Sequence, residues 1–230
     1  MKRRFGPRAW GVAAGACAVV AVMAVFLRPQ PSQINDVAIA PLLPGPVRIV
    51  AFGTSLTARS PWPDELQTVL SACRDAPVEV RRVAAPGAGS AWGQSLVSDV
   101  IAAQPDVVLL EFAINDADIL DGVPLSRART QHAAILDDLG AAVPEARIAL
   151  MTMNPAFGLR GIVRPFLNLH YQQYQALAAD HQVGLVDLYS RWLMAPRHIA
   201  KPADGLHPSP DQERQIIVPT LASALGCDAD

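Results

Sequence analysis

The stretch "AFGTSLTAR", Ala51 to Arg59, sets a small polar loop directly against the end of an apolar run. The residues leading into it, "VRIVAF" from 47 to 52, are mostly apolar and predict a buried strand. The chain then turns through Gly53, Thr54 and Ser55, at the point where enzymes built on parallel sheets often present a nucleophile. Ser55 is therefore the first candidate functional residue.

Beyond this stretch, short apolar runs alternate with amphipathic stretches along the chain. The runs predict strands at 47–52, 78–83, 106–112, 147–152 and 183–188, and the stretches predict helices at 63–73, 92–103, 127–143, 166–181 and 211–225. Strict alternation of strand and helix is typical of an α/β fold, in which a parallel sheet carries helices on both faces.

Length and charge limit the classes of protein to consider. The 230 residues, 51% of them hydrophobic, suffice for one globular domain with additional segments. A formal net charge of -2 offers no broad basic surface for phosphates, so nucleic acid is not expected as a partner. The sequence indicates no oligomeric state.

The N-terminal part predicts a membrane anchor. Residues 1–8 are basic, and Ala9 to Leu27 carry no charge. At about 1.5 Å per residue, this run spans roughly the 30 Å core of a bilayer as one transmembrane helix. The basic residues before it keep residues 1–8 in the cytoplasm. The rest of the chain is then expected on the extracytoplasmic, periplasmic side of a bacterial cytoplasmic membrane.

A signal peptide that is cleaved, giving a secreted protein, is the alternative to an uncleaved anchor. Signal cores usually run about 7 to 15 apolar residues before a small-x-small site. The nearest such site here, Ala38 to Ala40, lies well downstream, which favours the anchor. Residues 28–45 are rich in proline and predict an extended tether, and residues 46–230 form the predicted folded domain.

Three cysteines fit export from the cytoplasm. Cys17 falls in the predicted anchor, which leaves Cys73 and Cys227 as a candidate pair in an oxidising compartment. Each lies near the end of a predicted helix. Two buried free thiols are the alternative, because spacing alone does not establish a disulfide.

Polar residues collect where the predicted strands end. Ligands of parallel sheets bind at the carboxyl ends of the strands, so loops that follow different strands converge there. The candidates in these loops are Ser55, Gly87, Gly89, Asn115, Asp116, Asp204 and His207.

These residue types together suit acyl transfer. A serine hydroxyl becomes a nucleophile when an imidazole takes its proton, and a carboxylate holds that imidazole in the right tautomer. Asp204 and His207 supply both groups in one short loop. The negative charge that develops on the substrate oxygen needs preorganised donors, and a backbone N–H at Gly87 and the amide of Asn115 are of the right kind.

The four blocks resemble those of the GDSL or SGNH hydrolases, over about residues 47 to 225. "GTSLT", "PGAGS", "AINDA" and "DGLH" look like the four sequence blocks of that family. The resemblance implies a three-layer α/β/α sandwich with a five-stranded parallel sheet. It implies Ser55 as nucleophile, His207 as general base and Asp204 as its orienter. It also implies an oxyanion hole made by the Ser55 N–H, the Gly87 N–H and the Asn115 side chain, with no metal and no cofactor.

Two positions depart from the family pattern. Thr54 stands where the family commonly has Asp, and Ala113 where it commonly has Gly. Neither replaces a group with a direct catalytic role. Asn154, after the fourth predicted strand, is expected in the substrate pocket. The remaining histidines, His132, His170, His181 and His198, show no metal-ligand spacing and are expected on helix surfaces or in loops.

The expected function is therefore a membrane-tethered serine esterase. Its expected substrate is an ester-bearing small molecule, glycan or lipid, with O-acetyl esters of glycans favoured by the predicted location. A lysophospholipase, another lipid esterase or a thioesterase is the nearest alternative, because the fold sets little beyond the reaction class. An O-acetyltransferase using the same residues and a non-catalytic binding module of the same fold are the others.

Overall fold

The computed structural model describes residues 33–227, and the account that follows concerns this part of the chain. The predicted transmembrane helix at 9–27, the basic residues before it and the first part of the tether lie outside the described residues. Within 33–227, no helix combines the length and the apolar character needed to cross a bilayer.

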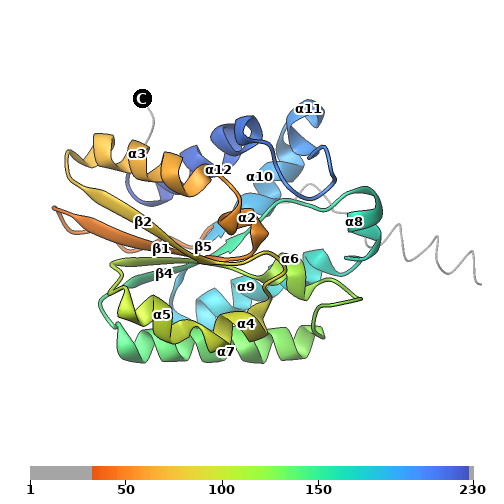
Figure 1. Ribbon diagram of the computed structural model, residues 1–230, viewed down its shortest axis with the longest axis horizontal. Helices are drawn as coiled ribbons and strands as arrows, with labels where there is room; N and C mark the ends of the chain where they lie inside the picture. Colours follow the sequence, from red (N-terminus) through yellow and green to blue (C-terminus); the bar gives the residue numbers. More distant parts are fainter. Residues whose placement is uncertain (1–32, 228–230) are drawn as a thin grey trace, which may run out of the picture. The chain divides into compact units, whose positions relative to one another are not determined.

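Five parallel strands form one sheet, in the order β2-β1-β3-β4-β5 (Figure 1). Each strand pairs in parallel with its neighbours, so all five carboxyl ends lie at one edge of the sheet. The strands are β1 (Val47–Gly53), β2 (Val78–Ala84), β3 (Val107–Glu111), β4 (Arg147–Thr152) and β5 (Gly184–Asp187). The central β3 is buried along its whole length, as expected for a strand covered on both faces.

Helices cover both faces of the sheet, which gives three layers (Figure 1). One layer contains α3 (Trp62–Arg74), α10 (Leu188–Met194) and α12 (Pro210–Ala224), and the other contains α4 (Ser90–Ser95), α5 (Val97–Ala102), α7 (Leu125–Ala142) and α9 (Leu167–His181). Four further short helices lie in the connections: α2 (Ser55–Ala58), α6 (Ala113–Asp116), α8 (Gly158–Ile162) and α11 (Arg197–Ala200). The predicted α/β/α sandwich with a five-stranded parallel sheet is confirmed.

One helix that the sequence predicts as continuous is divided into two in the structure. The sequence predicts a single helix over 92–103, whereas the structure has α4 and α5 with a break at Leu96. The Ser95 hydroxyl donates to the carbonyl of Trp92 at 2.7 Å, and the Leu96 N–H donates to Gly93. A serine that bonds the preceding turn in this way competes with the regular helical pattern.

The described segment before β1, residues 33–46, packs against the sheet. Val37 forms an antiparallel bridge with Leu185 of β5. Asp36 accepts from the backbone N–H of Asp187 at 2.8 Å and forms an ion pair with Arg191 of α10 at 2.7 Å. The described part of the predicted tether therefore covers the edge of β5, where an open strand would otherwise expose unpaired backbone groups.

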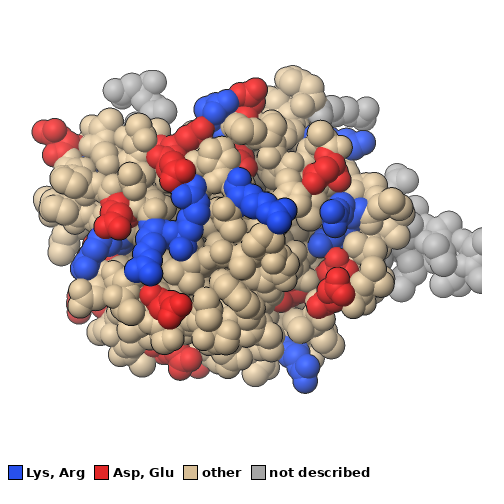
Figure 2. All heavy atoms as spheres, in the orientation of Figure 1, with Lys and Arg blue, Asp and Glu red and all other residues tan. Residues whose placement is uncertain are grey.

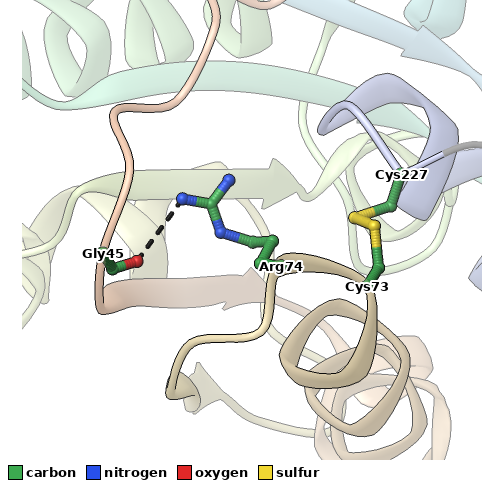
Figure 3. The surroundings of a disulfide bond; sticks show 4 residues. All are labelled: Gly45, Cys73, Arg74 and Cys227. Carbon is green, nitrogen blue, oxygen red and sulfur yellow. Dashed lines mark hydrogen bonds between the residues drawn. A yellow bond between two sulfur atoms is a disulfide. The ribbon is translucent and has the colours of Figure 1, made fainter.

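A disulfide joins Cys73, at the end of α3, to Cys227, just after α12 (Figure 3). Beside it, Arg74 reaches the segment before β1, where its guanidinium donates to the carbonyls of Leu43 at 2.6 Å and Gly45 at 3.4 Å. The bond links positions 154 residues apart, so it ties the last helix of the domain to the first long one.

Removing this disulfide is expected to lower the free energy of unfolding by about 2–5 kcal/mol, because a crosslink over so long a loop restricts the unfolded chain. Urea unfolding of the wild type, with and without dithiothreitol, measures the effect. The double variant Cys73→Ser, Cys227→Ser is the control, since it should be equally destabilised and insensitive to the reductant. A wild-type stability that dithiothreitol leaves unchanged would contradict the assignment.

The charged side chains are mixed on the face of the domain that Figure 2 shows. Basic and acidic groups are interspersed there, and several are paired, such as Arg82 with Asp64 and Arg214 with Glu65. Several basic side chains lie next to one another in the left and central part of this view, with acidic groups at their borders.

Candidate active site

Ser55 lies at the first residue of α2, directly after β1 and at the carboxyl edge of the sheet. Thr54 caps this short helix, because its side chain accepts a hydrogen bond from the Leu56 N–H at 3.1 Å. The sharp strand-to-helix turn therefore fixes the serine side chain at the edge where the loops after the other strands also arrive.

His207 comes from the loop that precedes α12, and it meets Ser55 across 152 positions of sequence. The distance from Ser55 Oγ to His207 Nε2 is 2.9 Å, and the distance from His207 Nδ1 to Asp204 Oδ2 is 2.7 Å. The structure thus brings the three predicted residues together in hydrogen-bonding order. With Nδ1–H donated to Asp204, Nε2 is free to accept the serine proton.

Asp204 is held as a carboxylate by its own loop. Its Oδ1 accepts from the backbone N–H groups of Leu206 at 2.8 Å and His207 at 2.7 Å, and its Oδ2 faces the imidazole. Partial burial alone would raise its pKa, but these hydrogen bonds lower the pKa of Asp204 to about 2. The group therefore stays ionised throughout the neutral range.

Asn154 does not line the cleft, so its predicted place in the substrate pocket is corrected. Its side chain is fully buried, and its Nδ2 donates to the carbonyl of Leu206 at 2.7 Å and to that of Pro155 at 3.1 Å. The residue follows β4 as expected, but the His207 loop covers it. It supports the backbone next to His207 from beneath.

Two backbone N–H groups in residues that line the cleft have no acceptor in the described part of the chain. Gly87 and Ser55 both line the cleft, and neither N–H donates to a protein acceptor within residues 33–227. Gly87 has a φ of +76°, a conformation that a residue with a side chain adopts only under strain. The loop after β2 therefore needs a glycine at this position in order to bring its N–H to the cleft.

Asn115 lines the same cleft from α6. Its Nδ2 donates to the carbonyl of Ala88 at 2.8 Å, which links the loop after β3 to the loop after β2. A primary amide has two N–H donors, so one remains for a ligand in the cleft. Ala113, the departure from the family glycine, is the first residue of α6 and is buried, so this helical position needs no glycine.

Glu111 is a residue of the site that the sequence analysis missed. It ends β3, is fully buried, and lies under the turn that carries Ser55. Its Oε1 accepts from the Thr54 N–H at 2.6 Å, the Thr54 hydroxyl at 2.9 Å and the Thr57 hydroxyl at 2.8 Å. Gly53 is required here, because a Cβ at that position would come within 2.3 Å of Glu111 Oε1.

The contacts of Glu111 also explain why a threonine suits position 54, where the family commonly has aspartate. The threonine hydroxyl donates to this buried acid, where an aspartate would place a second acid against it. Burial raises the pKa of Glu111 from 4.5 to about 7, against the hydrogen bonds from Thr54 and Thr57, which lower it. The only sequence signal was an acidic residue at the end of an otherwise apolar strand.

Glu111 should make stability fall with rising pH. Because its pKa is raised in the folded state, the folded protein binds its proton more tightly than the unfolded chain between pH 4.5 and about 7. This contribution is fully present below pH 4.5 and is lost as the pH rises to about 7, with a loss of at most about 3 kcal/mol. Urea unfolding at pH 5 and pH 8 measures it.

The variant Glu111→Gln should show a smaller fall than the wild type. The dependence that remains combines Glu213, whose pKa burial also raises to about 7, with His132 and His170, whose pKa values burial lowers and which therefore act in the opposite direction. The control is Glu79→Gln, on the exposed side of β2, which should keep the wild-type dependence. Equal falls in Glu111→Gln and the wild type would show that Glu111 does not titrate in this way.

Two histidines expected at the surface are instead buried. His132 and His170 are 1% and 5% exposed, because α7 and α9 turn these positions inward. His132 Nδ1 lies 2.8 Å from the Ala128 carbonyl, and its Nε2 lies 2.9 Å from the Tyr174 hydroxyl. The same hydroxyl accepts from the backbone N–H of Phe112, just before α6, at 3.0 Å. His132 therefore belongs to the support of the Asn115 turn.

Arg164, which no sequence pattern singles out, also holds this turn in place. Its side chain is almost fully buried, and its Nε donates to the Ile114 carbonyl at 2.7 Å. Its Nη2 forms an ion pair with Asp118 at 2.9 Å.

Within residues 33–227, no group of three His, Cys, Asp or Glu side chains lies close enough together to hold a metal ion.

A serine hydroxyl, an imidazole and a carboxylate in sequence, at the carboxyl edge of a parallel sheet, are the arrangement of a serine hydrolase. Residues 51–214 match the GDSL-like lipase/acylhydrolase family, and this match covers most of the chain. The protein belongs to that family and is an ester-hydrolysing enzyme. A search of curated protein sequences finds no match.

Solved structures with the same fold include an acetylxylan esterase and a lipase/acylhydrolase. A catalytic mutant of Axe2, an acetylxylan esterase from Geobacillus stearothermophilus, superposes with a TM-score of 0.70 at 16% identity, covering 81% of this chain and 97% of that chain. The lipase/acylhydrolase from Enterococcus faecalis gives a TM-score of 0.68 at 25% identity, covering 80% of this chain and 100% of that chain.

Proposed function

We propose that Ser55, His207 and Asp204 form the catalytic triad of this esterase. The Ser55 hydroxyl attacks the carbonyl carbon of the ester while His207 Nε2, 2.9 Å away, takes its proton. Asp204 stabilises the imidazolium that results, since its carboxylate is already aligned with Nδ1. The observation that carries the proposal is this unbroken order of hydrogen bonds from serine to carboxylate.

The remaining steps follow from the same groups. The tetrahedral intermediate collapses when His207 returns the proton to the leaving alcohol, which leaves an acyl group on Ser55 Oγ. A water molecule, deprotonated by His207, then attacks this acyl-enzyme and releases the acid and the free serine. In both acylation and deacylation, the developing oxyanion accepts hydrogen bonds from the N–H groups of Ser55 and Gly87 and from the Asn115 amide.

Asn115→Ala is expected to lower kcat by roughly 10²- to 10³-fold with little change in KM, because the amide acts on the oxyanion rather than on the bound ester. Kinetics on p-nitrophenyl acetate measure the loss. Asn115→Asp is the second variant: its side chain has nearly the same size, but as a carboxylate it cannot donate to the Ala88 carbonyl or to the oxyanion, and its negative charge opposes that of the oxyanion. An unchanged kcat in both variants would remove Asn115 from the oxyanion hole.

The proposed substrates are O-acetyl esters of envelope or exported glycans. The cleft holds about 420 Å³ and mixes polar and apolar surface, including Arg160, Asp121 and Trp92, which suits a sugar with a small acyl group. The likeness to an acetylxylan esterase fits this class of substrate. The uncharged run Ala9 to Leu27 supports a location on the outer side of the cytoplasmic membrane.

Lipid esters are the second candidate, and one feature of the domain favours them. A hollow of about 480 Å³ adjoins the cleft and shares Asp118 and Gly122 with it. Its lining is mainly apolar and includes Leu125, Phe166 and Leu169. A hollow of this kind has room for the acyl chain of an ester whose carbonyl carbon lies beside Ser55 Oγ.

A series of p-nitrophenyl esters from acetate to palmitate tests the proposed function on the full chain. A steep fall beyond short acyl chains supports glycan deacetylation, whereas a long-chain optimum supports lipid esters. Release of free acetate from an acetylated glycan separates hydrolysis from transfer to a second sugar. Absence of activity on every ester would support the non-catalytic alternative and overturn the proposal.

A further inference from the structure

Exposed apolar side chains concentrate at one end of the domain. Five of the ten large apolar residues that are exposed among the described residues lie on α8, on the loop after α6 and just before α9. We call them the apolar rim: Ile119, Leu120, Leu159, Ile162 and Phe166. Leu120 and Leu159 are 74% and 81% exposed. Single exposed apolar residues are ordinary, but such a group marks an interaction surface.

The members of the rim belong to one surface beside the active-site cleft. The Ile119 N–H donates to the Val163 carbonyl at 2.9 Å, which holds the loop after α6 against the end of α8. Leu159 and Ile162 are three residues apart on α8 and so point to the same side of that helix. Arg160 of the same helix lines the cleft, and α6 and α8 lie toward the same end of the sheet (Figure 1).

The chain also enters the domain at this end. Asp187 is the last residue of β5 and therefore lies at the carboxyl edge of the sheet, the edge that carries Ser55. The Asn35 N–H donates to Asp187 Oδ2 at 3.1 Å, and Val37 pairs antiparallel with Leu185. From there the segment runs toward the amino ends of the strands. There the Val47 N–H donates to the carbonyl of Pro77, just before β2 begins.

The proposed anchor restricts how far this end can be from a bilayer. Between Leu27 and Asn35 lie residues 28–34, which even when fully extended span only about 25 Å. A domain of this length has a radius of gyration of about 16 Å and thus a diameter of about 40 Å. The connection is too short to pass around the domain, so the carboxyl edge of the sheet is the end held near the membrane.

We propose that the apolar rim docks onto the outer surface of the lipid bilayer, so that the active-site cleft opens at the membrane surface. The proposal rests on the membrane anchor proposed above. Apolar side chains enter the boundary between headgroups and acyl chains, and Arg160 can reach lipid phosphates beside them. The exposed Asp121 lies on the cleft side, where it can stay in water. Substrates are then lipids or polymers held at that surface.

Tryptophans introduced at the rim test the docking in the full chain. Leu120→Trp and Leu159→Trp are reconstituted into vesicles of phosphatidylethanolamine and phosphatidylglycerol, with or without dibrominated phosphatidylcholine, which quenches tryptophans that touch it. The control is Leu43→Trp, which replaces a residue 73% exposed near the start of β1, at the opposite edge of the sheet. The emission of the parent chain is subtracted from that of each variant.

Brominated lipid should abolish much of the added emission of Leu120→Trp and Leu159→Trp and leave that of Leu43→Trp intact. Equal quenching at all three positions, or quenching at Leu43 alone, would overturn the proposed orientation. A blue-shifted emission at the rim without lipid quenching would mean that protein, such as a second copy, covers it, and would also overturn the proposal.

The anchor itself is followed separately in the same experiment. Trp10 lies within the proposed anchor, so its quenching in the parent chain, together with flotation of the chain with the vesicles, reports insertion. Insertion without quenching at the rim contradicts the docking alone. A parent chain that neither floats nor is quenched contradicts both the anchor and the docking, while the esterase activity on soluble esters remains an independent measurement.

Discussion

Ser55→Ala should lower kcat/KM on p-nitrophenyl acetate by roughly 10⁵- to 10⁶-fold, because the acyl-enzyme cannot form without the hydroxyl. The side chain loses one oxygen, whose one hydrogen-bond partner within residues 33–227 is His207 Nε2. The free energy of unfolding should therefore change little. Loss of activity with retained stability is the expected combination.

The matched control is Ser98→Ala, on the exposed side of α5. It removes the same atom from a serine outside the cleft and should keep wild-type kinetics. Substantial turnover by purified Ser55→Ala would mean that another group attacks the ester, and the proposed mechanism would fail.

Asp204→Asn should lower kcat by about 10³- to 10⁴-fold through the tautomer of His207. The asparagine Oδ1 can still accept from the backbone N–H groups of Leu206 and His207, so the loop should keep its shape. Its NH₂ group then faces Nδ1, which must act as acceptor, and the ring proton moves to Nε2. In that form the imidazole can no longer take the proton of Ser55.

The pKa of Asp204 gives this prediction a second part. Since that pKa is lowered to about 2, the carboxylate adds stability above pH 3.8 that is lost only as the pH falls toward 2. Activity measured above pH 5 should therefore show no titration of this group. Asp99→Asn, an exposed change on α5, is the control with the same loss of charge. Unchanged kcat in Asp204→Asn would contradict the role of Asp204.

Most of the sheet could be predicted from sequence because its strands are buried on both faces. Runs such as that of β3 are almost wholly apolar and stand out between amphipathic helices. The helices of four to seven residues, such as α2, α6 and α8, could not be predicted, since they are too short for a helical period to appear. The pairing of Val37 with β5 escaped notice because one bridge leaves no periodic pattern.

The residues of the site that lie in loops could be predicted from their residue types. The residues that support the site from buried positions in strands and helices could not. Ser55, Asp204 and His207 follow predicted elements in loops, so the convergence rule for parallel sheets placed them together. Glu111 lies inside a strand pattern and His132 inside a helix pattern, and both read as ordinary polar interruptions. Only the packed structure shows that each supports a turn of the active site.

Mass spectrometry of the full chain after reaction with a fluorophosphonate tests the central claim most directly. Such probes react with a serine that a neighbouring imidazole activates, so the adduct identifies the nucleophile. We predict one adduct, mapped to Ser55, absent in Ser55→Ala and formed much more slowly in Asp204→Asn. An adduct on another residue, or an unlabelled Ser55 in protein that still hydrolyses esters, would contradict this account.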